Sequence, residues 1–158
     1  MKSNLELDSR DWAILRLLQS DASLSVQQIA DEVGLSPNPC WRRIKQMEEA
    51  GIIARRVALV DPVKIGFAST AFVAIRTNRH DPEWLALFAG AIDEIDQVME
   101  CHRMAGDVDY MLKVRVRDIA DYDRVYRDLI DRVPGLIDVT TTFSMEEMKA
   151  STALPRPA

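Results

Sequence analysis

The sequence of 158 residues is poor in cysteine and contains no long apolar run. Its two cysteines, Cys40 and Cys101, are too few for a disulfide framework and are typical of reduced thiols. No apolar run approaches the length of a membrane span, and the charged amino terminus lacks the apolar region of a signal peptide. We therefore expect a cytoplasmic protein that has no membrane partner.

Motifs of common enzymes and metal sites are absent as well. The sequence has no Gly-x-Ser-x-Gly, no His-Glu-x-x-His and no phosphate-binding glycine loop. Potential metal ligands gather between Glu100 and Asp109, but there Glu100 and His102 would share one face of a strand while Cys101 points to the other. We therefore expect neither catalytic residues nor a metal site.

Length and composition fit two small domains. The apolar content of 47% suffices for compact domains, and Asp61-Pro62 and Gly66 interrupt regular structure between them. Pro155 and Pro157 lie in a short tail. We expect four segments, which are a first domain over 1–60, a linker over 61–66, a second domain over 67–150 and a tail over 151–158.

The first domain has the pattern of a helix-turn-helix protein. Ser25 with Gln28 has the spacing of a capping box, in which two side chains satisfy backbone donors at the start of a helix. Asp8, with Asp11 at the third position, provides a similar start for an earlier helix. Gly34 can adopt the left-handed conformation that ends a helix, so a short turn is predicted there.

A third helix is predicted to open within residues 36–39 and to end at Gly51. Ser36 is a usual cap, but Pro39 disfavours helical dihedrals at Asn38, so Asn38 with Pro39 at the first helical position is a second possible cap. The helix separates residues by character, with Cys40, Ile44 and Met47 on an inward face, Trp41, Arg42 and Lys45 pointing elsewhere, and Arg43 between the two groups.

A basic, alternating strand is predicted over residues 52–60, in the position of a wing. Between Ser36 and Arg56 the net charge is +3, whereas the whole chain carries -5. A basic edge on an acidic body suits a specific DNA binder, although helix-turn-helix pairs also occur as plain packing units. The residues expected at DNA are Ser36, Asn38, Pro39, Trp41, Arg42, Arg43, Lys45, Arg55 and Arg56.

The rest of the chain alternates between strand and helix patterns. Strands are predicted over 67–78, 97–105, 109–117 and 136–145, and helices from Asp81 onward and over 119–133. The expected inward residues are Ile119, Tyr122, Tyr126, Leu129, Ile130 and Val133 on the second helix, and Ile137, Val139, Phe143 and Met145 on the last strand. The fold class is thus α+β, a winged helix-turn-helix followed by a ferredoxin-like βαββαβ regulatory domain.

Both faces of the strand over 67–78 are apolar. A ferredoxin-like sheet carries helices on one face only, so we expect the other face to be buried against a second copy of the chain. Two reading helices related by a twofold axis would then bind a pseudo-palindromic site on double-stranded DNA.

Several short motifs resemble those of one known family. They are Leu35-Ser36-Pro37-Asn38-Pro39-Cys40, Arg42-Arg43-Ile44, Glu48-Glu49-Ala50-Gly51-Ile52-Ile53, Glu100-Cys101-His102 and Gly106-Asp107-Val108-Asp109-Tyr110. Over nearly the whole chain they resemble the Lrp/AsnC, or feast/famine, family of bacterial transcriptional regulators. The resemblance implies a carboxy-terminal domain that forms homodimers, assembles dimers into octamer-like discs and binds an amino acid between dimers. Cys40-Trp41 and the segments 103–106 and 133–136 are similar to a branch that responds to cysteine.

Given this resemblance, the loop around Gly106 is the candidate effector site. Backbone amides of Ala105, Gly106 and Asp107 can receive a carboxylate, an aspartate can accept the ammonium group, and Gly106 permits close approach. Without the resemblance the loop could equally be a plain turn, and the threonines of the last strand are also good strand formers. The candidate effector contacts are Met104, Ala105, Gly106, Asp107, Asp109, Tyr110, Thr140, Thr141 and Thr142.

The sequence therefore predicts a regulator of transcription whose assembly or DNA affinity is changed by a small amino acid. We expect no cofactor besides this effector and no enzymatic activity. The alternative is an amino-acid-sensing oligomer, or a small enzyme, whose basic helix is incidental.

Overall fold

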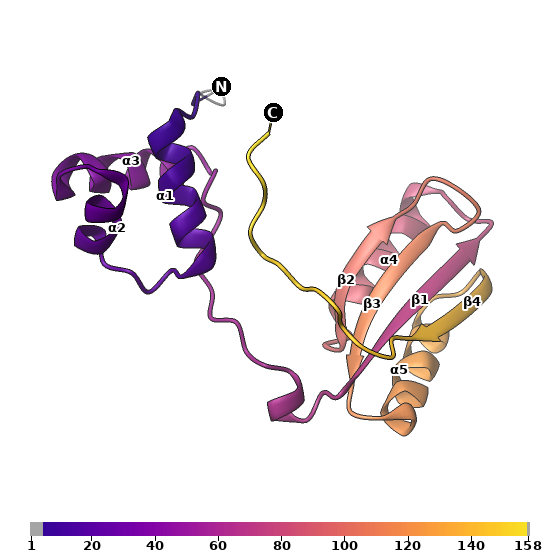
Figure 1. Cartoon of the computed structure of the whole chain (residues 1–158). Helices are drawn as coiled ribbons and strands as arrows, with labels where there is room; N and C mark the ends of the chain where they lie inside the picture. Colours follow the sequence, from indigo (N-terminus) through magenta and orange to yellow (C-terminus); the bar gives the residue numbers. More distant parts are fainter. Residues whose placement is uncertain (1–4, 158) are drawn as a thin grey trace. The chain divides into compact units, whose positions relative to one another are not determined.

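The computed structural model describes residues 5–157, and the chain forms two compact units (Figure 1). The first unit holds the chain up to Leu59 together with the residues from Met148 onward, and the second unit is Val60–Glu147. None of the helices among residues 5–157 has the length and apolar character needed to cross a membrane. The chain thus leaves the first unit after Leu59 and returns to it at Met148.

The first unit contains the helices α1 Ser9–Ser20, α2 Val26–Val33 and α3 Pro37–Glu49. The two predicted helix starts are confirmed. Asp8 accepts a hydrogen bond from the Asp11 amide at 2.9 Å, and Asp11 accepts one from the Asp8 amide at 3.0 Å. Ser25 and Gln28 form the same reciprocal pair before α2, and Gly34 ends α2 with a φ of 65°.

The start of α3 matches the first of the two possible caps. Ser36 is at the cap position and Pro37 is the first helical residue, but the Ser36 side chain makes no capping hydrogen bond. The predicted inward face of α3 is confirmed. Its three residues are buried with parts of α1 and α2 in a core made of Ile14, Leu15, Ile29, Ala30, Cys40, Ile44 and Met47.

The predicted strand over residues 52–60 is wrong. The amides of Ile52 and Ile53 donate to Met47 O, at 2.9 and 3.2 Å, and the chain after them forms no strand in the part that the structure describes. A strand needs a neighbour whose backbone donors and acceptors face its own. The carboxy-terminal tail lines one groove together with residues 52–59, but its Pro155 and Pro157 have no N–H group to donate to a neighbouring strand.

The tail lies along α1. Thr152 Oγ1 donates to Gln19 O at 3.3 Å, and the Leu154 amide donates to Gln19 Oε1 at 2.8 Å. Together with residues of α1 and residues 52–59, the tail lines a groove of about 780 Å³. Both ends of the sequence therefore contribute to the first unit.

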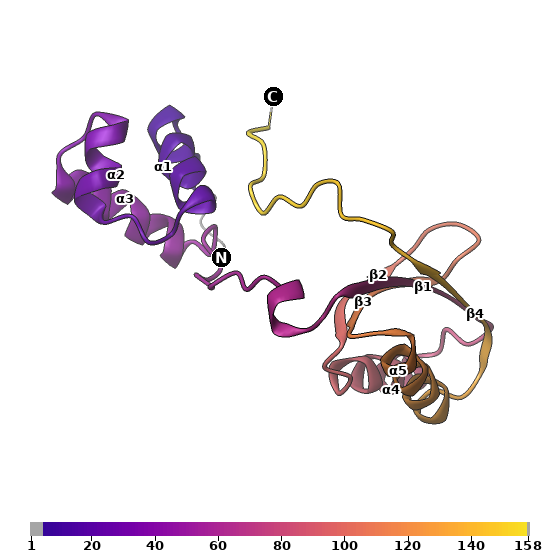
Figure 2. The ribbon, with the colours of Figure 1, turned by 60° about the horizontal axis from the view of Figure 1, so that its bottom comes forward.

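The second unit follows the predicted order of strands and helices. After a short 3-10 helix, Val63–Ile65, its elements are β1 Ser69–Thr77, α4 Pro82–Asp93, β2 Val98–Arg103, β3 Tyr110–Val116, α5 Ile119–Arg132 and β4 Leu136–Phe143. The strands form an antiparallel sheet in the order β2-β3-β1-β4, and α4 and α5 cover one of its faces (Figure 2). This arrangement confirms the ferredoxin-like fold.

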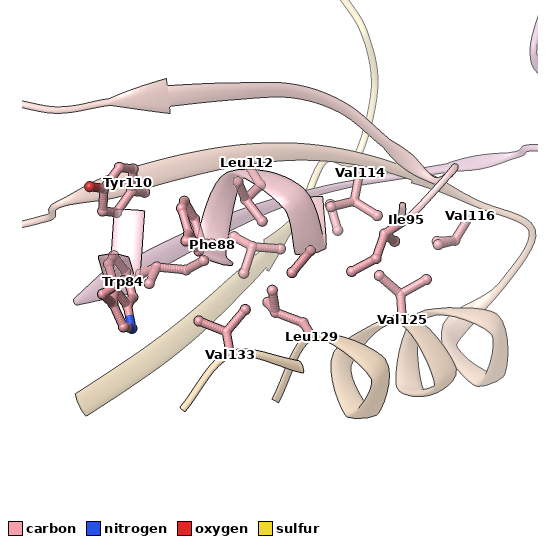
Figure 3. Close-up of a cluster of buried hydrophobic side chains, with 14 residues drawn as sticks. Trp84, Phe88, Ile95, Tyr110, Leu112, Val114, Val116, Val125, Leu129 and Val133 are labelled. Carbon is pink, nitrogen blue, oxygen red and sulfur yellow. The ribbon is translucent and has the colours of Figure 1, made fainter. Parts of the chain in front are cut away.

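The core of the second unit lies between the sheet and the two helices (Figure 3). Trp84 is 1% exposed and stacks on Phe88, with ring centroids 5.1 Å apart. Its Nε1 donates a hydrogen bond to Pro134 O at 2.7 Å. The start of α4 is thereby fastened to the turn that precedes β4.

The inward stripe predicted for α5 is partly wrong. Val125 and Leu129 are buried, together with the Asp121 carboxylate, whereas Ile119 is 73% exposed. The buried residues recur every four positions, so the face that meets the sheet is rotated from the predicted stripe. Ile119 is the first residue of α5 and lies outside the buried core of the second unit.

The apolar face predicted for β4 is also partly wrong. Ile137 is 61% exposed because Leu136 pairs with Thr77 while Asp138 pairs with Arg76, so that Ile137 is an extra residue at a bulge. Met145 is fully exposed and follows the end of β4. The alternating pattern alone could not show the bulge, because the bulge depends on the register with β1.

Candidate DNA interface and effector-binding loop

The side of α3 that faces away from the core is the candidate DNA interface. Burial of its inward residues fixes the rotation of the helix and leaves the opposite side in solvent. Trp41 is 50% exposed, and Arg42 beside it is exposed as well. Ser36, Asn38 and Pro39 are exposed at the start of the helix. All five candidates are thus exposed at or near the start of α3.

Arg43 is held by the framework of the first unit. Its Nη1 lies 2.8 Å from Asp8 Oδ2 and 2.7 Å from Asp11 Oδ1, which joins α3 to the start of α1. Both ion pairs raise the pKa of Arg43. The Asp11 amide, followed by the Arg43 guanidinium, lowers the pKa of Asp8 from 3.8 to about 2. Arg43 is thus a structural contact in the unbound chain.

The other basic candidates divide into paired and free side chains. Lys45 Nζ lies 2.6 Å from Glu48 Oε2, and Arg56 Nη2 lies 3.1 Å from Glu48 Oε1. Lys45, and to a lesser extent Arg56, lowers the pKa of Glu48. Arg42 and Arg55 form no ion pair with any residue between 5 and 157. They are the two cations of this region that are free to meet phosphate or base edges.

The candidate effector loop connects β2 and β3. The Met104 amide donates to Asp109 O at 2.8 Å and closes the loop, while the Asp109 amide donates to Ile75 O at 3.0 Å. Within the described chain, the amides of residues 105–108 donate no hydrogen bond. Gly106 has a φ of 149°, which side-chain-bearing residues rarely adopt. The loop therefore offers unpaired donors at an exposed position.

The two aspartates of the loop differ in their surroundings. Asp109 Oδ2 accepts a hydrogen bond from the Thr77 amide at 2.8 Å, and Asp109 Oδ1 lies 3.7 Å from His80 Nε2. Asp107 is exposed and has no ion-pair partner in residues 5–157. Thr77 and His80 were not predicted near this loop, because only the register of β1 against β3 brings them there.

Tyr110 lies in the core and not in the exposed part of the loop. Its ring is 5% exposed, with its centroid 4.6 Å from that of Phe88 and 6.0 Å from that of Trp84 (Figure 3). In the part of the chain that the structure describes, its hydroxyl is the one buried side-chain polar atom without a hydrogen-bond partner. Tyr110 thus holds the end of the loop by packing its ring against α4, on the helix-covered face of the sheet.

The three threonines of β4 point to different faces. The Thr141 hydroxyl is hydrogen-bonded to the Tyr122 hydroxyl on the helix side of the sheet. Thr140 and Thr142 lie on the helix-free face, because alternate residues of a strand point to opposite sides. Thr140 Oγ1 donates to Asp138 Oδ2 at 3.1 Å. Since β2 and β4 are opposite edges of the sheet, one chain does not gather the threonines around Gly106.

Comparisons with known proteins assign both halves of the chain. The family model of the winged helix-turn-helix DNA-binding domain matches residues 7–54. The model of the Lrp/AsnC ligand binding domain matches residues 70–154, which is more than half of the chain. These matches cover the helices of the first unit and all of the sheet of the second except Ser69.

Relatives of known function and structure share the complete architecture. The chain is 46% identical over 149 residues to the DNA-binding transcriptional activator DecR of Escherichia coli, covering 94% of this chain and 98% of the relative. An AsnC family transcriptional regulator from Agrobacterium tumefaciens superposes with a TM-score of 0.91 and 50% identity, covering 94% of this chain and 97% of that one. A transcriptional regulator from Neisseria meningitidis, solved as a complex with L-Met, has a TM-score of 0.89 and 31% identity over 95% and 97% of the two chains. The protein described here belongs to the Lrp/AsnC family of DNA-binding transcriptional regulators.

Proposed function

We propose that this regulator reads its operator with the exposed side of α3, and that an amino acid bound at the loop between β2 and β3 changes this binding. The observation that carries the proposal is the exposure of Trp41 and Arg42 on a helix whose opposite side is buried. A reading helix enters the major groove and places its first turns against the base edges. The DNA-binding role of the matched domain and of the relative from Escherichia coli supports this use of α3.

The basic residues would act differently in the complex. Arg42 and Arg55 have no ion pair within residues 5–157 to give up, so they would meet DNA at the lowest cost in free energy. Lys45 and Arg56 would exchange Glu48 for phosphate. Arg43 would keep α3 in place. Ser36, Asn38 and Pro39 would lie at the end of the helix nearest the bases.

The effector would bind through its charged main-chain groups. The amides from Ala105 to Asp107, which donate no hydrogen bond within residues 5–157, would receive its carboxylate, and Asp107 would accept its ammonium group. Asp109 and Tyr110 would hold the loop in shape, and the Met104 amide would close it by its hydrogen bond to Asp109 O. The complex of the regulator from Neisseria meningitidis with L-Met supports an amino acid as effector. Cysteine is one candidate, because of the subgroup motifs in the sequence.

Assembly would complete both functions. The helix-free face of the sheet carries Phe72, which is 41% exposed, and a second copy would cover it. A homodimer presents two reading helices to a pseudo-palindromic operator, and further assembly, to an octamer for example, would bring loops and threonines of different dimers together. The protein would act in the cytoplasm, on the chromosome, without catalysing a reaction and without a cofactor besides its effector.

The test is the binding of a fluorescent duplex, selected from a random pool with the full-length protein, in the presence of unlabelled competitors. We expect the selected sequence to compete far better than a scrambled one. Arg42→Ala should weaken specific binding by between about fivefold and about 150-fold, which corresponds to the loss of ~1–3 kcal/mol for a base-reading arginine. Gln46→Ala, also exposed on α3, is the matched control and should bind like the parent. Equal competition by all duplexes would favour the alternative, an amino-acid-sensing oligomer or enzyme.

The effector part is tested by a thermal-shift screen of the amino acids. A ligand that binds the folded state alone raises the melting temperature, and the same amino acid should shift DNA affinity. Asp107→Ala should abolish both shifts while DNA binding without effector stays unchanged. Unaltered amino-acid affinity in this variant would remove the loop from the effector site.

A further inference from the structure

The start of α3 offers almost no backbone donors. Pro37 and Pro39 have no N–H group, and the Cys40 amide donates to Ser36 O at 3.1 Å. Among residues 36–40, the amides of Ser36 and Asn38 are the two that have no partner in the described structure. Free amides of the first turn are what make a helix N-terminus bind phosphate. This end of α3 is therefore poorly suited to phosphate, and its side chains must supply the contacts.

Those side chains form a stripe along the exposed side of the helix. Asn38 lies three and four residues before Trp41 and Arg42, and Lys45 lies four and three residues after them, which are the spacings that make side chains neighbours on a helix surface. Trp41, in the middle of the stripe, exposes half of its surface to water. The side chains of Asn38 and Trp41 make no hydrogen bond with any residue from 5 to 157. A large apolar group in this position is available for contact with a partner surface.

We propose that Trp41 packs against the methyl group of a thymine in the major groove and that Asn38 reads the adenine of a neighbouring base pair. The inference rests on the proposed use of α3 as the reading helix. Thymine is the base that presents an apolar group on its major-groove edge, and a carboxamide matches the adenine edge with two hydrogen bonds. The unpaired Asn38 amide group and the exposed indole supply this pair of contacts.

The spacing of the two residues fits neighbouring base pairs. A helix rises about 1.5 Å per residue, so Asn38 and Trp41 are separated by about 4.5 Å along the axis. Successive base pairs are separated by about 3.4 Å along the duplex. Arg42, one residue further, would then face the backbone or a guanine on the next pair. The half-site is thus expected to contain an adenine and a thymine within two adjacent pairs.

A contact of Trp41 with deoxyribose is the main competing placement. A sugar contact depends on the shape of the backbone and is the same whether or not the base carries a methyl group. A contact with thymine is lost when the methyl group is removed. Replacing thymine by deoxyuridine removes this group and leaves the hydrogen-bonding edge of the base intact, so it separates the two placements.

The experiment starts from the duplex selected with the full-length protein. Each thymine of a half-site is replaced in turn by deoxyuridine, and the dissociation constant is measured by fluorescence anisotropy at fixed salt. We expect one position in each half-site to weaken binding about fourfold, as burial of one methyl group predicts. In Trp41→Ala the thymine and deoxyuridine duplexes should bind equally at this position. Trp41→Phe, which keeps an aromatic ring, should retain part of the difference.

Two controls make the result specific to Trp41. Gln46→Ala lies on the same helix and should keep the fourfold difference of the parent. Asn38→Ala should relax the preference for adenine at the neighbouring pair while the thymine effect persists. If the selection enriches no sequence, reading by α3 fails as a whole. If a sequence is enriched but no thymine shows a methyl effect, or if the effect survives in Trp41→Ala, the proposed contact is wrong and DNA reading itself stands.

Discussion

At the scale of single residues, neighbours decide which charges of the first unit remain available. Arg42 and Arg43 are adjacent in the sequence, yet Arg43 is bound to Asp8 and Asp11 while Arg42 has no ion pair among residues 5–157. The sequence placed Arg43 between the inward and outward faces of the helix, and the distances supply its two partners. The number of positive residues on α3 therefore exceeds the number of positive side chains that are available to contact DNA, because some of them are already ion-paired.

Asp121 gives the second unit an acid-sensitive contact. It is buried at the start of α5 and lies 2.9 Å from Arg117 Nη2 and 2.7 Å from Arg124 Nη2. The Arg117 side chain, followed by the Arg117 amide, lowers the pKa of Asp121 from 3.8 to about 2. A carboxyl group with a lowered folded-state pKa stabilises the fold above its ordinary pKa and loses this contribution as the pH falls toward the folded value.

We therefore expect the free energy of unfolding to decline between about pH 4 and pH 2. Asp121→Asn should lower stability at pH 7 by about 1–3 kcal/mol, since charged hydrogen bonds are lost, and should reduce the decline below pH 4. Urea unfolding at a series of pH values measures both effects. An unchanged pH profile in the variant would show that Asp121 contributes nothing to acid sensitivity.

Tyr110 and Tyr122 permit a matched comparison of two hydroxyl groups. The Tyr110 hydroxyl is buried and has no hydrogen-bond partner among residues 5–157, whereas the Tyr122 hydroxyl is bonded to Thr141. Tyr110→Phe removes an unsatisfied polar atom and should leave stability equal or higher by up to about 1 kcal/mol, while Tyr122→Phe should lower it by about 1 kcal/mol. Thermal unfolding of both variants tests the difference. A large destabilisation by Tyr110→Phe would indicate that an ordered water satisfies this hydroxyl.

At the scale of elements, local signals predicted helices better than they predicted strand pairing. The starts at Asp8 and Ser25 depend on residues within one turn, so the sequence contains all that determines them. The segment 52–60 alternates like a strand but pairs with no other strand in the described part of the chain, and Ile137 follows the pattern but lies at a bulge. Both outcomes depend on segments distant in sequence, which periodicity cannot show.

The candidate sites show the same division. Periodicity along α3 correctly predicted the exposed position of Trp41, because burial of the opposite face determines it. Periodicity in the second unit could not predict that the Tyr110 ring packs against Phe88 of α4 or that His80 lies near Asp109. Both contacts follow from the packing of the sheet. The sequence therefore predicted which residues form the loop between β2 and β3, but not that Thr77 and His80 lie beside it.

The two serine caps make a prediction at this scale. Ser25 accepts a hydrogen bond from the Gln28 amide, whereas Ser36 occupies the equivalent position before α3 without a side-chain bond. Ser25→Ala should therefore cost about 1 kcal/mol of unfolding free energy, and Ser36→Ala should cost clearly less. Chemical denaturation compares the two variants under the same conditions. Equal losses would mean that Ser36 forms its cap in solution.

At the scale of the whole molecule, the helix-free face of the sheet is the expected site of dimerisation. Phe72 lies on this face and is 41% exposed, and Leu87 is 43% exposed on α4. Phe72→Glu should convert dimers to monomers because it would place a charge in the apolar centre of the interface. Leu87→Glu introduces the same charge on the helix side and should leave dimers intact. Light scattering measures the molar mass of both variants. A dimeric Phe72→Glu variant would contradict dimerisation through the helix-free face of the sheet.

The return of the chain to α1 limits how this regulator can be recombined with others. The first unit is assembled from residues before Leu59 and after Met148, and Gln19 binds both Thr152 and Leu154. A hybrid that exchanges only the amino-terminal part would place a foreign tail against α1. Swapping of DNA specificity between relatives, by laboratory design or by gene exchange, should therefore work better when both segments travel together.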